Sequence, residues 1–215
     1  LDGEADHSGG TPMGIMYRRD ANLAGARIAC ALDDLCDRYL SNGADLVQTQ
    51  GVLNSDRSLN VRNPLVYSSG LTKVSAQQYS EWDFRSNDDQ FLKEYVSLAC
   101  KLIPEVASRH RVGCRIEEIS TSAALAETNR QILGVIQAVT ESLGYQSQCM
   151  PSGPGHDAAI VASQKYSKAR SGLLIPVGMI FTPCRNGKSH DPSEYATPSQ
   201  ITKGANVLAQ TMYEL

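Results

Sequence analysis

The sequence of 215 residues predicts an α/β protein made of two consecutive blocks. Two observations predict this class. Segments whose apolar residues recur every three or four positions alternate along the chain with short segments of alternating or continuous apolar residues, a pattern typical of mixed helices and strands. The pattern also changes near Ser120, because four strands are expected before this residue and only two after it. The length is consistent with one or two domains of about 100 to 200 residues each.

The first block begins with polar residues and a strand that ends near His7 and is expected to be truncated. A helix is expected over Met16–Leu40, with Asp20 and Asn22 in its first turns and Gly43 as the stop signal. The remaining elements follow in order. They are a strand over Asp45–Leu53, a long loop over Asn54–Gly70, a strand over Leu71–Arg85, a helix over Asn87–His110 and a strand over Val112–Ile119.

This order of strand, helix, strand, strand, helix and strand is the split βαβ, or ferredoxin-like, arrangement. In the second block we expect helices over Ala123–Leu143, Asp157–Ala169 and Thr197–Leu215 and strands over Tyr145–Met150 and Leu173–Phe181. Two strands are fewer than the four to six of a usual sheet. The second block is therefore expected to be incomplete, with poor solubility when isolated.

Composition excludes several classes of protein. The net charge of -3 and the absence of a basic stripe with interleaved aromatic residues argue against a nucleic-acid partner. No apolar run approaches the length of about 20 residues that spans a bilayer, so no membrane partner is expected. Six scattered cysteines without a Cys-x-x-Cys pair predict reduced thiols in a cytoplasmic protein. The chain begins at Leu1 without an initiator methionine, so we expect residues, including any targeting sequence, to precede it.

Two histidines lie where chemistry is expected. His156 follows a Gly-Pro-Gly turn, and His190 follows the apolar run Leu173–Phe181 and the polar loop after it. A side chain just beyond the C-terminal end of a buried strand lies at the edge where α/β proteins place their sites. Both histidines are therefore candidates for catalysis or metal binding.

Five segments together resemble the zinc-dependent amidohydrolases of the M20 peptidase clan, and specifically the hydantoinase/carbamoylase branch. This branch includes N-carbamoyl-L-amino-acid hydrolase, β-ureidopropionase, and allantoate and ureidoglycolate amidohydrolases. The segments are DHSGGTPM (6–13), RRDA (18–21), WDFR (82–85), MPSGPGHDA (150–158) and MIFTPCRNGKSHDPSEY (179–195). They keep the order of the family and span nearly the whole chain.

The resemblance implies that residues 1–119 form a lid and dimerisation domain and that residues 120–215 form the C-terminal part of a catalytic domain like that of the zinc exopeptidases. It implies a homodimer assembled through the lid. It also implies two divalent metal ions, zinc or alternatively manganese, cobalt or nickel. The family's N-terminal catalytic half, with most of the metal ligands, is not in this sequence, so we expect the chain to be inactive alone.

The resemblance assigns roles to individual residues. His190 matches a metal ligand, and neutral imidazole suits zinc. His156 matches a histidine that polarises the scissile carbonyl. His7 matches a lid histidine that stabilises the oxyanion in the neighbouring subunit's active site. Each could instead be a structural or surface histidine.

Arg85 matches the arginine that binds the substrate carboxylate, a role suited to the guanidinium fork. The family pairs it with an asparagine in a segment that differs here, where Asn63 is the chosen counterpart. Gly153 and Gly155 are expected to let the backbone approach the substrate, since glycine tolerates positive φ.

The function implied is metal-dependent hydrolysis of a linear amide or carbamoyl C–N bond in a small carboxylate-bearing substrate, such as an N-carbamoyl amino acid or a ureido acid. The alternative is a non-catalytic dimerisation or scaffold module derived from such an enzyme. The sequence does not choose among the individual substrates.

Overall fold

The computed structural model describes residues 1–55, 70–119, 130–153, 155–163 and 175–215. The chain divides into two compact units, Leu1–Ala123 and Ala124–Leu215. The described helices and strands follow one another in the order β1, α1, β2, β3, β4 and α2 in the first unit and α3, α4, a 3₁₀ turn η3 and α5 in the second.

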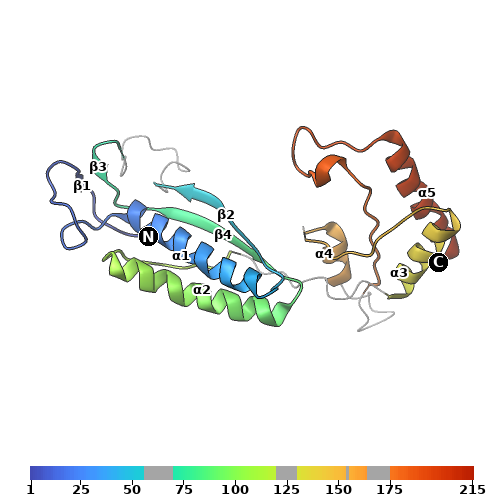
Figure 1. Ribbon diagram of the computed structural model, residues 1–215, viewed down its shortest axis with the longest axis horizontal. Helices are drawn as coiled ribbons and strands as arrows, with labels where there is room; N and C mark the ends of the chain where they lie inside the picture. The colour runs from blue at the N-terminus through green and yellow to red at the C-terminus, as the bar shows by residue number, and fades with distance from the viewer. Residues whose placement is uncertain (56–69, 120–129, 154, 164–174) are drawn as a thin grey trace. The chain divides into compact units, whose positions relative to one another are not determined.

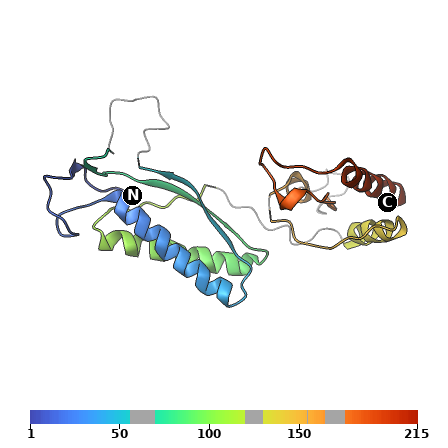
Figure 2. The same ribbon diagram turned by 45° about the horizontal axis from the view of Figure 1, so that its top comes forward.

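Two helices of equal length form one layer of the first unit. They are α1 (Ala21–Ser41) and α2 (Asp89–Arg109), which lie side by side along the strands β2 and β4 (Figures 1 and 2). Each begins at an aspartate that caps it. The Asp20 carboxylate accepts hydrogen bonds from the backbone N–H groups of Asn22 and Leu23, at 3.0 and 3.1 Å.

The Asp88 carboxylate accepts in the same way from Gln90 and Phe91, at 2.9 Å each. These bonds satisfy N–H groups that have no partner within a helix, which fixes where each helix starts. The expected start of the first helix at Met16 is therefore wrong, because Asp20 is extended and caps it. Gly43, with φ of +80°, ends the same helix as expected.

The strands form two antiparallel pairs. β2 (Val47–Asn54) pairs with β4 (Tyr79–Arg85), from Val47 opposite Arg85 to Asn54 opposite Tyr79, with an irregularity between Gln50 and Val52. β1 (Asp6–His7) pairs with β3 (Lys73–Val74). The single strand expected over Leu71–Arg85 is thus two strands, with Ser75, Ala76, Gln77 and Gln78 between them.

Two isolated bridges lie outside these strands. Asp2 bridges Gln77 on one side and Gly113 on the other. Asp2 exchanges backbone hydrogen bonds with Gly113 at 2.9 and 2.8 Å. The beginning of the chain therefore lies between the segment that leads into β4 and the segment that follows α2.

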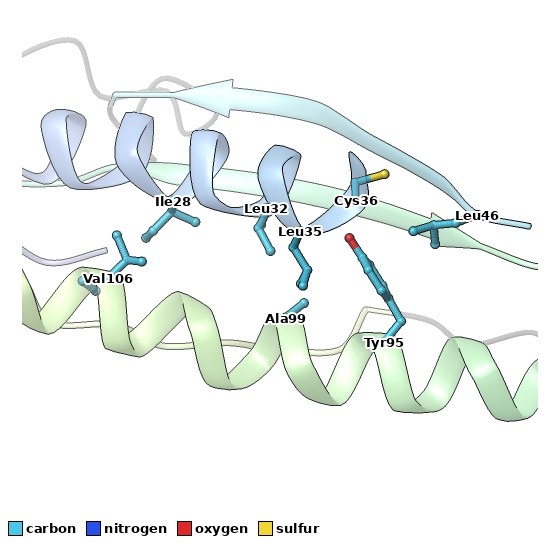
Figure 3. Packing of buried hydrophobic residues seen from close by; sticks show 9 residues of the cluster. Ile28, Leu32, Leu35, Cys36, Leu46, Tyr95, Ala99 and Val106 are labelled. Atoms are coloured by element: carbon cyan, nitrogen blue, oxygen red, sulfur yellow. The ribbon is translucent and has the colours of Figure 1, made fainter. Parts of the chain in front are cut away.

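The core of the first unit lies between the two helices and the strands. Ile28, Leu32 and Leu35 of α1 face Ala99 and Val106 of α2 (Figure 3). Tyr95 and Leu32 are fully buried. The rings of Tyr39, Phe84 and Phe91 lie 5.4, 5.8 and 6.1 Å from the Tyr95 ring. Phe84 and Trp82 of β4 pack on this core, so the core fixes the strand that ends at Arg85.

The described regular elements of the second unit are all helices or helical turns, and its other described residues form long irregular segments. α3 (Arg130–Ser142) and α5 (Pro198–Glu214) pack together, and the short helix α4 (Asp157–Ser163) and the turn η3 (Arg185–Gly187) lie between them in the chain (Figure 1). A capping box starts α5, in which Thr197 and Gln200 exchange side-chain and backbone hydrogen bonds. Gly144, with φ of +71°, follows the end of α3 as expected.

Three expected strands are not formed in the described residues. Val112–Ile119 makes only the single bridge of Gly113, while Tyr145–Met150 and the described part of Leu173–Phe181, from residue 175 onward, are not in strands. The reason is that a strand exists only where a second segment pairs with its backbone groups. Apolar patterning identifies a segment suited to a sheet but does not supply the partner.

Among the described residues, no helix combines the length and the apolar character needed to cross a membrane.

Candidate active-site residues

His7 lies on the exposed end of β1, at the start of a loop that runs to α1. Its Nδ1 accepts a hydrogen bond from the backbone N–H of Gly9 at 3.0 Å. Its own backbone N–H donates to the Asp6 carboxylate at 2.7 Å. Hydrogen bonds from Thr11 and from the His7 backbone hold the pKa of Asp6 below its ordinary value. The preceding carboxylate is thus held as an anion that fixes the backbone of His7.

Arg85 is the last residue of β4, opposite Val47 of β2. Its Nε donates to Oδ2 of Asp83 at 2.7 Å, and its Nη2 lies 2.6 Å from the same oxygen. Alternate residues of a strand point to the same face, which brings Asp83 and Arg85 together. Both side chains are about half exposed, at 47% and 45%. The guanidinium is therefore held in one orientation at the surface of the first unit.

His156 precedes α4, and its ring lies edge-on to the Phe181 ring, with centroids 5.5 Å apart. Its Nε2 is buried and has no hydrogen-bond partner among the described residues. A buried polar atom without a partner costs about 1 to 3 kcal/mol, so nearly all such atoms in natural proteins bond to protein, water or a ligand. This nitrogen is therefore a candidate to bond water or a ligand, and it is the feature of the second unit that best indicates a site.

His190 lies in an exposed loop after the turn η3. The loop is closed at its base by the hydrogen bond from the Arg185 N–H to the Tyr195 carbonyl at 2.8 Å. His190 itself has φ of 57°, in the left-handed region that non-glycine residues rarely adopt. Its backbone N–H donates to the Glu194 carboxylate at 2.9 Å. The loop thus holds His190 in a defined but costly conformation, which is common at functional sites.

The two glycines of the turn before His156 do not use the left-handed conformation that we expected. Neither Gly153 nor Gly155 has a positive φ, and a Cβ added at either would meet nothing within 4 Å. Asn63 lies outside the described residues.

The predicted site residues fall into two sets. His7 and Arg85 belong to the first unit, and His156 and His190 belong to the second. No three His, Cys, Asp or Glu side chains of the described residues are grouped so that they could hold a metal ion. His190 is a suitable single ligand, but the donor set that a bound metal needs is not assembled by the part of the chain that the structure describes.

Sequence reasoning missed two residues that the geometry adds. Asp83 orients Arg85, and Arg18 donates to three backbone carbonyls beside His7. Asp83 could have been found from its spacing, because it precedes Arg85 by two residues on the same strand. No sequence signal shows which carbonyls Arg18 contacts.

The chain belongs to the peptidase family M20/M25/M40, whose model matches residues 7–214. This family typically binds metal ions. The family assignment confirms the resemblance that the five segments indicated.

Curated relatives place the chain in the hydantoinase/carbamoylase branch. It is 25% identical to ureidoglycolate hydrolase of Oryza sativa subsp. japonica, over 100% of this chain and 39% of that protein. It is 27% identical to allantoate amidohydrolase of Escherichia coli strain K12, over 100% of this chain and 46% of that protein. It is 25% identical to N-carbamoyl-L-amino acid amidohydrolase of Geobacillus stearothermophilus, over 99% of this chain and 45% of that protein. The chain thus spans less than half the length of these relatives.

Solved structures with a similar fold come from the same group of enzymes. The hydantoinase/carbamoylase family amidase of Burkholderia vietnamiensis matches with a TM-score of 0.78 at 25% identity, over 99% of this chain and 45% of that one. AtUAH in complex with glyoxylate matches with a TM-score of 0.79 at 24% identity, over 99% of this chain and 44% of that one, which shows a shared fold.

Proposed function

We propose that this chain takes part in the hydrolysis of an amide or carbamoyl C–N bond in a small ureido or carbamoyl substrate that carries a carboxylate. The observation that carries the proposal is the family match over residues 7–214, since it spans both His7 and His190. The three curated relatives described above are named for ureidoglycolate, allantoate and N-carbamoyl amino acids. These substrates share a ureido group and a carboxylate, so one site chemistry would serve them all.

We further propose that residues 1–119 are a ferredoxin-like lid and that residues 120–215 are the C-terminal part of the catalytic domain. The bridges of Asp2 support the lid topology, because they place the first segment between the two segments that the split βαβ order requires. β2 pairs only with β4 among the described strands, which leaves one edge of β2 for another strand. A homodimer formed through the lid would use such an edge.

The loop after His7 supports contact with a second protein surface. Four of its large apolar side chains are exposed, with Met13 and Met16 at 77%, Tyr17 at 64% and Ile15 at 47%. Such a group of exposed apolar residues is typical of an interaction site. A second copy of the chain would cover the loop and receive His7 in its active site.

Within this proposal, Arg85, His156 and His7 have different roles. Arg85, oriented by Asp83, binds the substrate carboxylate and so fixes the distance from that group to the scissile carbonyl. The unpartnered Nε2 of His156 would bond the substrate at the carbonyl, and His7 would donate to the oxyanion that forms when water adds to it. A preorganised donor of this kind commonly contributes about 10² to 10³ in rate.

We propose His190 as one metal ligand, and zinc as the metal, with manganese, cobalt and nickel as alternatives. The other ligands would have to come from residues outside the described part of the chain. Two divalent ions are expected for the complete site by likeness to the family.

The test is a chimera in which this chain replaces the matching 45% of the N-carbamoyl-L-amino acid amidohydrolase of Geobacillus stearothermophilus. Ammonia release from N-carbamoyl amino acids, ureidoglycolate and allantoate is measured together with the metal content of the purified protein. We expect turnover of at least one of the three. H190A should abolish turnover and lower the bound metal.

H110A is the matched control, because it also removes one imidazole, from a residue that ends α2 and lies outside the proposed site. A folded, dimeric chimera that binds both metals but hydrolyses none of the three substrates would contradict the enzymatic proposal. That result would favour the non-catalytic scaffold instead.

A further inference from the structure

The hydrogen bond from Gly9 to His7 determines which ring nitrogen carries the proton. A neutral imidazole has one N–H donor and one acceptor nitrogen. Because Nδ1 accepts from the Gly9 N–H at 3.0 Å, the proton of the neutral ring lies on Nε2. His7 therefore presents an N–H donor at the end of its exposed side chain, directed away from its own backbone.

This arrangement depends on the shape of the short turn after His7. The His7 carbonyl accepts hydrogen bonds from the backbone N–H groups of Gly10 at 2.9 Å and Thr11 at 3.2 Å, and from the Thr11 hydroxyl at 3.3 Å. The turn keeps the Gly9 N–H close to the imidazole. Space there is limited, because a Cβ added at Gly9 would lie 3.3 and 3.4 Å from His7 ring atoms.

Arg18 holds the turn from inside the loop. Its Nη2 donates to the carbonyls of Ser8 at 2.6 Å and Thr11 at 2.8 Å, and its Nε donates to the Pro12 carbonyl at 3.2 Å. One planar guanidinium thus binds three carbonyls, on both sides of Gly9 and Gly10. Its side chain is half buried, whereas His7 is exposed.

A second arginine holds the outer end of the loop. Arg111, which has φ of 57°, donates from its guanidinium to the Met16 carbonyl. Arg19 in turn donates to the Arg111 carbonyl at 2.9 Å. The loop is therefore held by hydrogen bonds to the segment after α2 as well as by those within the loop.

We propose that Arg18 is a positioning residue that, through the turn at Gly9, keeps His7 in the Nε2–H form and holds its donor in a fixed direction. The inference deepens the function proposed above, in which His7 acts as a donor to the oxyanion. Lysine could not replace Arg18, because a single ammonium group cannot match the planar fork of donors that spans the three carbonyls.

The test uses the full chain labelled with ¹⁵N-histidine and does not depend on activity. Two-dimensional NMR at about pH 8.5, above the ordinary imidazole range near 6.5, distinguishes an N–H nitrogen from an unprotonated one. We expect an unprotonated Nδ1 and a protonated Nε2 at His7. The other three histidines in the same spectrum are internal references.

The variants are R18Q, R18K and the matched control R19Q, which removes a neighbouring guanidinium without contacts to residues 8–12. Loss of one backbone hydrogen bond to the ring should shift the tautomer ratio about fivefold toward Nδ1–H. We expect this shift in R18Q, a smaller one in R18K, and none in R19Q. Hydrogen exchange of the Gly9 amide should accelerate in the same order.

Trp82 fluorescence, which reports the packing of β4, checks that each variant is folded. A protonated Nδ1 in the unmodified chain would overturn the inference. An unchanged tautomer ratio in folded R18Q, or an equal shift in R19Q, would overturn it as well. If the chimera described above is inactive while the NMR result holds, the proposed function fails and the positioning of His7 stands.

Discussion

Tyr95→Phe tests whether the buried hydroxyl between α2 and β2 stabilises the unit that carries His7 and Arg85. The Tyr95 ring is fully buried and its hydroxyl donates to Oε1 of Gln48 at 2.6 Å. Phenylalanine keeps the ring and its packing on Tyr39, so the variant removes the hydrogen bond to Gln48 and the weaker interaction of the hydroxyl with the Cys36 thiol. Such a bond contributes about 1 kcal/mol.

The partner of the hydroxyl limits the loss. The Gln48 side chain is half buried, so water can reach the acceptor and no isolated buried oxygen is left. The free energy of unfolding should therefore fall by about 1 kcal/mol rather than by the larger cost of an unsatisfied buried group. With a slope of about 2 kcal/mol per molar urea, the unfolding midpoint should fall by about 0.5 M.

The assay is urea unfolding followed by the fluorescence of Trp82, the single tryptophan of the chain. Its ring is stacked on Phe84, with centroids 6.4 Å apart, so the signal reports the first unit and not the second. Tyr39→Phe is the matched control, because the Tyr39 hydroxyl has no hydrogen-bond partner among the described residues. An unchanged midpoint for Tyr95→Phe, or an equal change in both variants, would refute the reasoning.

Three further predictions concern the first unit. Leu32→Ala leaves a cavity at a fully buried position. It should lower the free energy of unfolding, measured by the same fluorescence, by about 2 to 5 kcal/mol. A loss under about 1 kcal/mol would show that the site is not close-packed. The pKa of Tyr95 lies above its ordinary value of 10.0, mainly because the ring is buried and secondly because Cys36 lies nearby. A pKa that is higher in the folded state adds stability that is complete below about pH 10 and is lost as the pH rises above it. The free energy of unfolding of Tyr95→Phe should therefore depend less steeply on pH above about pH 10. An unchanged slope would contradict this. In the chimera, Arg85→Lys should raise KM for a carboxylate substrate about tenfold or more, since one charge-assisted bond contributes about 1.5 to 3 kcal/mol. An amide substrate without a carboxylate is the control, and its KM should not change.

The sequence proposes which residues form the candidate site, but it does not indicate the contacts that these residues make. The segments around His7, Arg85, His156 and His190 each carry a recognisable pattern of residues. The contact of His156 with Phe181 joins residues 25 positions apart. Nothing in either local pattern indicates this contact, because it depends on how the chain returns.

Local sequence accounts for the described helices and for most of their ends, because these depend on residues within one or two turns of each other. The start of α1 is the exception, since it was expected at Met16 and lies at Ala21, after the cap Asp20. Asp88, Thr197, Gly43 and Gly144 act through local hydrogen bonds and local backbone angles. The tertiary fold settled which apolar segments became strands, since a strand needs backbone partners from elsewhere in the chain. It alone also decided that Arg18 would bind the turn beside His7, because the side chain of one residue reaches carbonyls 6 to 10 positions away only after the loop has closed.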